Sequence, residues 1–143
     1  MESAHLLELP QKLHYDPQMY AAVNGTLYRY FAVIGGVYQL GSIAAALALT
    51  YVVRRRGPSF GWTLAGALCL SIAFGIWLAV VAPVNQQAAV TMRDAPDALP
   101  VMWGALRHRW EYGHVAGFVA QLIGFCALVC SVLVETPQSP ARS

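Results

Sequence analysis

The sequence predicts an all-α membrane protein, a small helical bundle in which three transmembrane helices are clear. Of its 143 residues, 57% are hydrophobic and only 11% are charged, whereas a soluble domain usually carries about 25% charged residues. Three apolar stretches, residues 30–53, 60–84 and 113–134, are long enough to cross a bilayer as helices. We therefore expect contact with the lipid bilayer and one bundle domain over residues 17–143.

Residues 1–16 form the first element, and they are too short to span a membrane. They also contain Pro10, which disfavours a long helix. We expect an N-terminal arm or an interfacial segment here.

The first spanning helix is predicted to begin well before the membrane. Asp16 and Pro17 combine an N-cap acceptor with proline at the first helical position. No breaker stronger than Gly25 follows, so one helix is expected over residues 17–53. The run from Arg54 to Pro58 closes it.

The second and third helices are bounded by prolines. Pro83 and Asn85 are expected to close the second span, with a loop over residues 85–99 after it. Pro100 can open a long third helix, which also starts before the membrane and stops at Glu135.

Charge gives an expected orientation. The only basic run, Arg54 to Arg56, lies in a short loop, and such loops stay in the cytoplasm. We expect loop 54–58 and the C-terminus in the cytoplasm of a bacterial inner membrane, with the N-terminus and loop 85–99 outside. A net charge of +2 without a basic patch gives no reason to expect a nucleic-acid partner.

The densest polar segment, residues 103–114, opens the third helix. Residues three or four apart share a helical face, so Arg107, Glu111 and His114 form one stripe, in which Arg107 can pair with Glu111. Gly113 and Gly117 beside it form the small-xxx-small pattern of a helix contact. The stripe is therefore expected to point into the bundle.

Two glutamines are predicted to form a clamp deeper in the membrane. At about 1.5 Å per residue, Gln39 of the first helix and Gln121 of the third reach a similar depth, which favours a hydrogen bond between them. Above that level, three separate segments bring polar residues to one height: Tyr28, Asn85, Arg107, Glu111 and His114.

Ionisable residues in membrane helices are costly and tend to be functional. The candidate catalytic residues are His114, Arg107, Asn85 and Glu111. Trp103, Trp110 and Tyr28 would form aromatic walls for a flat ligand. The alternatives are an interfacial aromatic belt for the aromatic residues, an ion pair that only holds the helix, and a hydrogen-bonded core histidine at position 114.

Cofactor signals are weak. No helix carries the paired histidine and carboxylate spacing of a metal site, and no metal or cofactor is predicted. Haem ligation by His114 and an arm histidine, His5 or His14, stays open as an alternative.

The segment Ala82-Pro83-Val84-Asn85, together with Trp103 and the run from Arg107 to His114, resembles small membrane proteins of the anthrone-oxygenase-like family. The resemblance covers about the C-terminal half. It implies oxidation of anthrones by molecular oxygen without metal or flavin. It also implies that His114 takes a proton from the substrate while Arg107 and Asn85 hold the resulting oxyanion.

Two functions follow as expectations. The first is a membrane enzyme, monooxygenase-like, that acts on a hydrophobic aromatic or phenolic small molecule. The alternative is a non-catalytic membrane subunit or interaction protein, because the small-residue faces equally suit a homo-oligomer or a membrane partner. A cavity of a few hundred cubic ångströms beside Asn85, Arg107 and His114 would favour the enzyme.

Overall fold

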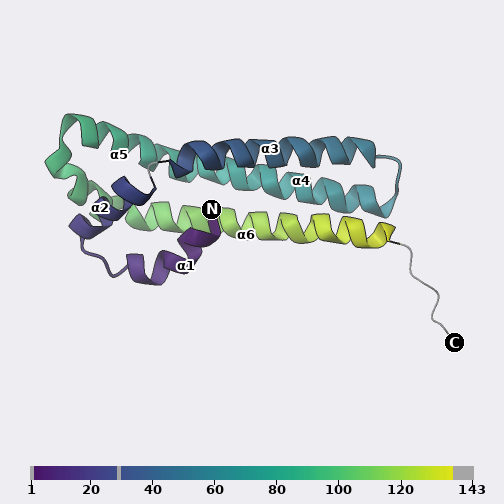
Figure 1. The fold of residues 1–143 in the computed structure, drawn as a ribbon, viewed down its shortest axis with the longest axis horizontal. Coiled ribbons are helices and arrows are strands. Elements are labelled where there is room, and N and C mark those ends of the chain that lie inside the picture. The colour runs from purple at the N-terminus through teal and green to yellow at the C-terminus, as the bar shows by residue number, and fades with distance from the viewer. Residues whose placement is uncertain (1, 29, 137–143) are drawn as a thin grey trace.

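Three long apolar helical stretches run along one another in the computed structural model, which describes residues 2–28 and 30–136 (Figure 1). They are Val33–Val52, Pro58–Asp94 and Pro96–Glu135, each long and apolar enough to cross a membrane. This confirms the predicted all-α bundle with three spans. Residues 137–143, which follow the predicted end of the third helix at Glu135, lie outside the described residues.

The first span is helix α3 (Phe31–Val52), which packs on α4 (Pro58–Ile76). Its outer face exposes apolar side chains such as Val33, Val37 and Leu40, as expected for a helix face that contacts lipid. The third span is α6 (Leu99–Glu135), preceded by the 3₁₀ turn η2 (Pro96–Ala98). It starts one residue before Pro100, close to the predicted start.

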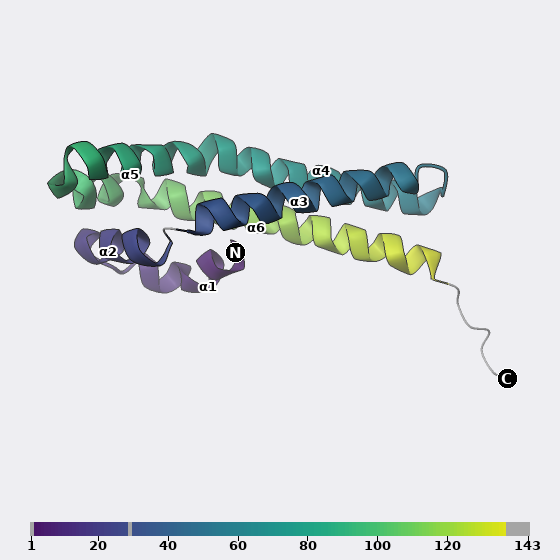
Figure 2. The same cartoon turned by 45° about the horizontal axis from the view of Figure 1, so that its top comes forward.

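The N-terminal segment folds into two helices that lie against α6 (Figure 2): α1 (Glu2–Lys12) and α2 (Pro17–Leu27). The predicted cap is confirmed, since Oδ1 of Asp16 accepts from the amide of Met19 at 2.8 Å. The predicted continuous helix over residues 17–53 is wrong. The chain breaks after α2 because α2 packs on α6 while α3 packs on α4, and one straight helix cannot follow both.

The second span does not stop at Pro83, so the predicted loop over residues 85–99 is also wrong. Helix α4 passes through a π-helical turn, η1 (Trp77–Val81), into α5 (Ala82–Asp94). Pro83 has no amide hydrogen to offer the carbonyl four residues earlier. Nη2 of Arg109 donates to that carbonyl, Ala79 O, at 3.4 Å. The wider π turn lets the helix continue past the proline.

Close packing and hydroxyl groups hold α4 against α6. A Cβ added to Gly124 would lie 3.1 Å from the carbonyl oxygen of Gly66, so the backbones approach closely there. Toward the end of the bundle that carries the basic run, Oγ of Ser131 lies 2.9 Å from Oγ of Ser59 and 2.6 Å from Oγ1 of Thr63. These bonds satisfy polar groups that lipid cannot.

The predicted glutamine clamp is confirmed. Nε2 of Gln121 donates to Oε1 of Gln39 at 2.9 Å, and Nε2 of Gln39 donates to the carbonyl of Leu70 at 3.0 Å. One amide therefore joins α3 to both neighbouring helices at mid-bundle.

The main apolar core lies at the other end, where α2, α5, η1 and α6 meet. It is built on buried aromatic and aliphatic side chains, among them Tyr20, Val81, Val84, Trp103 and Trp110. This core fixes the part of α6 that carries the candidate site.

Candidate functional site

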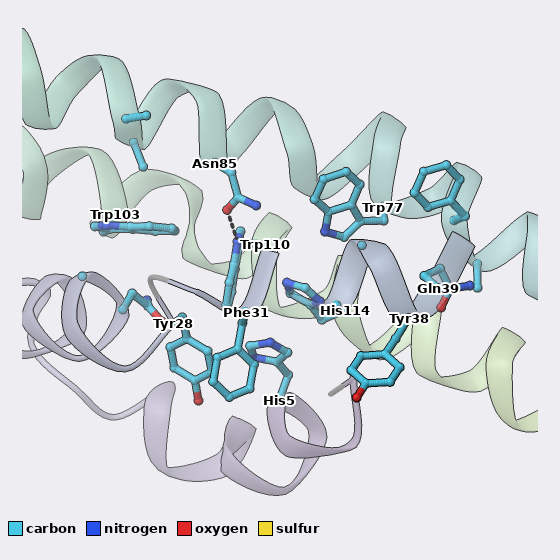
Figure 3. A pocket seen from close by; sticks show the side chains of 18 of the residues that line it. His5, Tyr28, Phe31, Tyr38, Gln39, Trp77, Asn85, Trp103, Trp110 and His114 are labelled. Atoms are coloured by element: carbon cyan, nitrogen blue, oxygen red, sulfur yellow. Dashed lines mark hydrogen bonds between the residues drawn. The ribbon is translucent and has the colours of Figure 1, made fainter. Parts of the chain in front are cut away.

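A cavity of about 730 Å³ lies at the end of the bundle that the two N-terminal helices cover (Figure 3). Its volume falls within the roughly 300–1,000 Å³ of small-molecule pockets. Every helix of the described chain from α1 to α6 contributes to its lining, so residues far apart in sequence meet there.

Two histidines from opposite ends of the chain form a pair in this cavity. His5 of α1 and His114 of α6 are both buried, and their rings stack with centroids 4.0 Å apart and planes 23° apart. The indole of Trp110 meets both rings edge-on, with centroid distances of 4.8 Å to His5 and 4.4 Å to His114. The predicted histidine therefore lies in the cavity with a second one beside it.

The predicted aromatic residues line the cavity. Trp103 and Trp110 are only 5% and 4% exposed, and Tyr28 closes the side next to His5. Burial on this scale does not fit an interfacial belt for the two tryptophans. Tyr112, by contrast, is 54% exposed and does not line the cavity. Its exposure fits the interfacial belt.

Asn85 of α5 lines the cavity in a fixed orientation. Its Oδ1 accepts from Nε1 of Trp110 at 2.7 Å. Because an indole N–H only donates, the oxygen of the amide must face Trp110. The amide nitrogen then points away from Trp110, as Figure 3 shows. Asn85 thus offers a hydrogen-bond donor to a ligand oxygen.

Glu111 does not line the cavity. It is 0% exposed, and its Oε1 accepts from the hydroxyl of Tyr20 at 2.8 Å and lies 3.6 Å from Nζ of Lys12. Lys12 is 2% exposed, and its Nζ lies 3.9 Å from the ring centroid of Tyr28. The cluster of Glu111, Tyr20 and Lys12 therefore lies behind the aromatic wall and ties α1 and α2 to α6.

Arg107 is also outside the cavity lining. Its Nη1 donates to the carbonyl of Tyr15 at 2.7 Å, which fastens the turn between α1 and α2 to α6. The predicted ion pair of Arg107 with Glu111 is not among the salt bridges of the residues described. Each of the two side chains binds the N-terminal segment instead.

Comparison with protein-family models, with curated proteins and with solved structures finds no similar family, relative or fold.

Burial shifts two titrations in the N-terminal segment. It lowers the pKa of His5 to about 2, with His114 and Lys12 adding to the effect through their charges. Burial and the neighbouring Glu111 raise the pKa of Tyr20 well above its usual value. At neutral pH His5 is therefore an uncharged imidazole, and Tyr20 stays a hydroxyl donor to Glu111.

The histidine pair does not have the geometry of a haem site. Imidazole lone pairs lie in the ring planes, and the planes of His5 and His114 are stacked. The two rings therefore do not present opposed nitrogens to one iron.

Sequence reasoning missed Lys12 and Tyr20 as parts of the site, and it named His5 only as one of two arm histidines that could ligate haem with His114. A signal was present in α1, where His5, Glu8 and Lys12 recur three and four residues apart on one helical face. A polar stripe on a segment next to a membrane bundle indicates that the segment packs on it. Tyr20 had no such signal, because one tyrosine in an amphipathic helix is ordinary.

Proposed function

We propose that this protein is a membrane enzyme that oxidises a flat, lipid-soluble aromatic substrate with molecular oxygen and without a metal or flavin. The observation that supports it is the cavity, in which a histidine pair and an oriented amide face a space between aromatic walls. Trp103, Trp110 and Tyr28 suit a planar ring system of the phenolic class.

The chemistry follows from the two kinds of polar group at the wall. The imidazole of His114 takes a proton from the acidic ring carbon of an anthrone-type substrate, and the electron pair moves onto the substrate's carbonyl oxygen. Nδ2 of Asn85 donates to the oxyanion so formed. Arg107, which the family resemblance also implied for this role, instead holds the N-terminal segment.

The remaining steps balance with one molecule of oxygen. The carbanion reduces O₂ and bonds to it, and the imidazolium returns the proton to give a hydroperoxide on the same carbon. Loss of water from the hydroperoxide then leaves a ketone. One oxygen atom enters the product and the other leaves as water, while the substrate carbon is oxidised from CH₂ to C=O.

The test is oxygen uptake and anthraquinone formation from anthrone by the protein purified in mild detergent, corrected for spontaneous oxidation. General-base catalysis contributes about 10²–10⁴-fold, so His114→Ala should lower kcat by at least about 100-fold. His108→Ala is the matched control, because His108 is exposed on the same helix outside the cavity lining. Full activity in His114→Ala would show that the base assignment is wrong.

The contacts of Glu111 and Arg107 favour a second function, that of a non-catalytic membrane subunit. Both side chains hold helices together, and neither lines the cavity. If the purified protein adds nothing to the spontaneous rate and instead elutes with a membrane partner, this second function is the better one.

A further inference from the structure

One nitrogen of His5, a residue that lines the cavity, has no hydrogen-bond partner among the residues described. Nδ1 of His5 is buried, and none of the residues the structure describes donates to it or accepts from it. His5 as a whole is 3% exposed and lines the cavity. Buried polar atoms in proteins nearly always have a partner, so an isolated one beside a cavity indicates a ligand group.

The imidazole ring of His5 is packed against three other rings. It stacks on His114 at 4.0 Å, and it meets Tyr28 and Trp110 at centroid distances of 4.8 Å each. Helix α1 is anchored in turn by the buried contact of Lys12 with Glu111. The direction of Nδ1 is therefore set by packing on three sides (Figure 3).

The chemistry of a neutral imidazole narrows the partner. In one tautomer Nδ1 accepts a hydrogen bond, and in the other it donates one. A hydroxyl group can meet either tautomer, because it both donates and accepts. A carbonyl oxygen suits only the donating form, and an ammonium only the accepting form.

We propose that His5 binds a hydroxyl group of the ligand through Nδ1, so that the N-terminal helix selects hydroxylated over unsubstituted aromatic rings. This rests on the proposed function to the extent that the cavity takes a flat aromatic molecule. The ligand is then held at two places, by Asn85 at a carbonyl or oxyanion and by His5 at a hydroxyl.

The experiment compares two probes that differ by one hydroxyl, 2-hydroxyanthraquinone and anthraquinone. Binding to the purified full-length protein is followed by quenching of tryptophan fluorescence, since Trp77, Trp103 and Trp110 line the cavity. One buried hydrogen bond corresponds to a preference of about tenfold. We expect that preference for the hydroxylated probe in the unaltered protein.

Two variants distinguish the contribution of Nδ1 to binding from that of the ring. His5→Phe keeps a ring to stack on His114 but removes Nδ1, and it should lose the preference by weakening only the hydroxylated probe. His5→Asn places an amide group near the position of Nδ1, and it should keep most of the preference. Thermal unfolding of both variants checks that α1 still folds onto the bundle.

The outcomes separate the inference from the proposed function. Equal binding of the two probes by the unaltered protein, or an equal loss for both in His5→Phe, would overturn the role of His5 while leaving turnover of anthrone unaffected. A tenfold preference that depends on His5, in a protein that does not oxidise anthrone, would support the role of His5 and refute the enzyme. Failure to bind either probe would overturn both.

Discussion

At the residue scale, the end of the bundle that carries the site holds a buried contact between Lys12 and Glu111. Both charges are almost fully withdrawn from solvent, and removing one partner of such a pair typically costs about 3–5 kcal/mol. Glu111→Gln should therefore lower the free energy of unfolding by about 3 kcal/mol, the lower end of that range, because Lys12 keeps Glu8 at 3.4 Å and Gln still offers Tyr20 an acceptor. Unfolding in mixed micelles measures this.

A double variant tests whether the lost stability comes from leaving the buried charge of Lys12 without Glu111. Lys12→Met combined with Glu111→Gln removes both buried charges. The carboxylate left without its partner is then Glu8, whose side chain is 45% exposed and lies 3.4 Å from Lys12 in the unaltered protein, so most of the lost stability should return. Turnover of the folded single variant should stay near that of the unaltered protein, because Glu111 does not line the cavity. Lost turnover with unchanged stability would instead make Glu111 a catalytic residue.

At the element scale, local rules predicted what depends on local chemistry. Hydropathy gave the three spans, Asp16 gave the start of α2, and helical rise placed Gln39 and Gln121 at one depth. Each of these follows from spacing along one or two helices, which the sequence contains directly.

What the sequence did not predict depends on contacts between distant segments. The break after α2 arises because α2 and α3 pack on different helices. The helix continues past Pro83, where Arg109 donates to the carbonyl of Ala79 that Pro83 leaves without a backbone amide. Arg107 and Glu111 looked like partners because they share a face of α6. Docking of the N-terminal segment gave each of them a different partner.

Docking of α1 should depend on pH through His5. Burial, His114 of α6 and Lys12 of α1 lower the pKa of His5 from 6.5 to about 2 in the docked state. Between these values the undocked arm binds the proton and the docked arm does not, so docking loses stability as pH falls below about 6.5. The free energy of docking weakens by about 1.4 kcal/mol for each pH unit, which is a tenfold change in the docking equilibrium constant.

Spin labels can follow this equilibrium. Leu7 of α1 and Tyr112 of α6 are both exposed, and cysteine substitutions there place one label on each helix. The fraction of molecules in which the two labels lie farther apart should grow as pH falls below 6.5. His5→Phe should remove most of this dependence. An unchanged pH response in that variant would assign the effect to another group.

At the scale of the whole molecule, the bundle has two chemically different ends. Arg54, Arg55 and Arg56 lie at the end where α3 turns into α4, and Nη1 of Arg56 lies 3.0 Å from Oε2 of Glu135. The N-terminal helices α1 and α2 lie toward the opposite end (Figure 1), and both contribute to the lining of the cavity. Basic residues at that end are partly balanced, as where Arg93 pairs with Asp94 at 2.7 Å.

This asymmetry predicts that the cavity opens toward the outer side of the membrane, since basic residues in short loops remain in the cytoplasm. In a background where Cys69, Cys126 and Cys130 are replaced by alanine, Asp97→Cys should react with an impermeant thiol reagent in intact bacterial cells. Thr136→Cys, near the basic run, should react only after the membrane is opened. The reverse pattern would place the cavity on the cytoplasmic side, where a lipid-soluble substrate would enter from the inner leaflet.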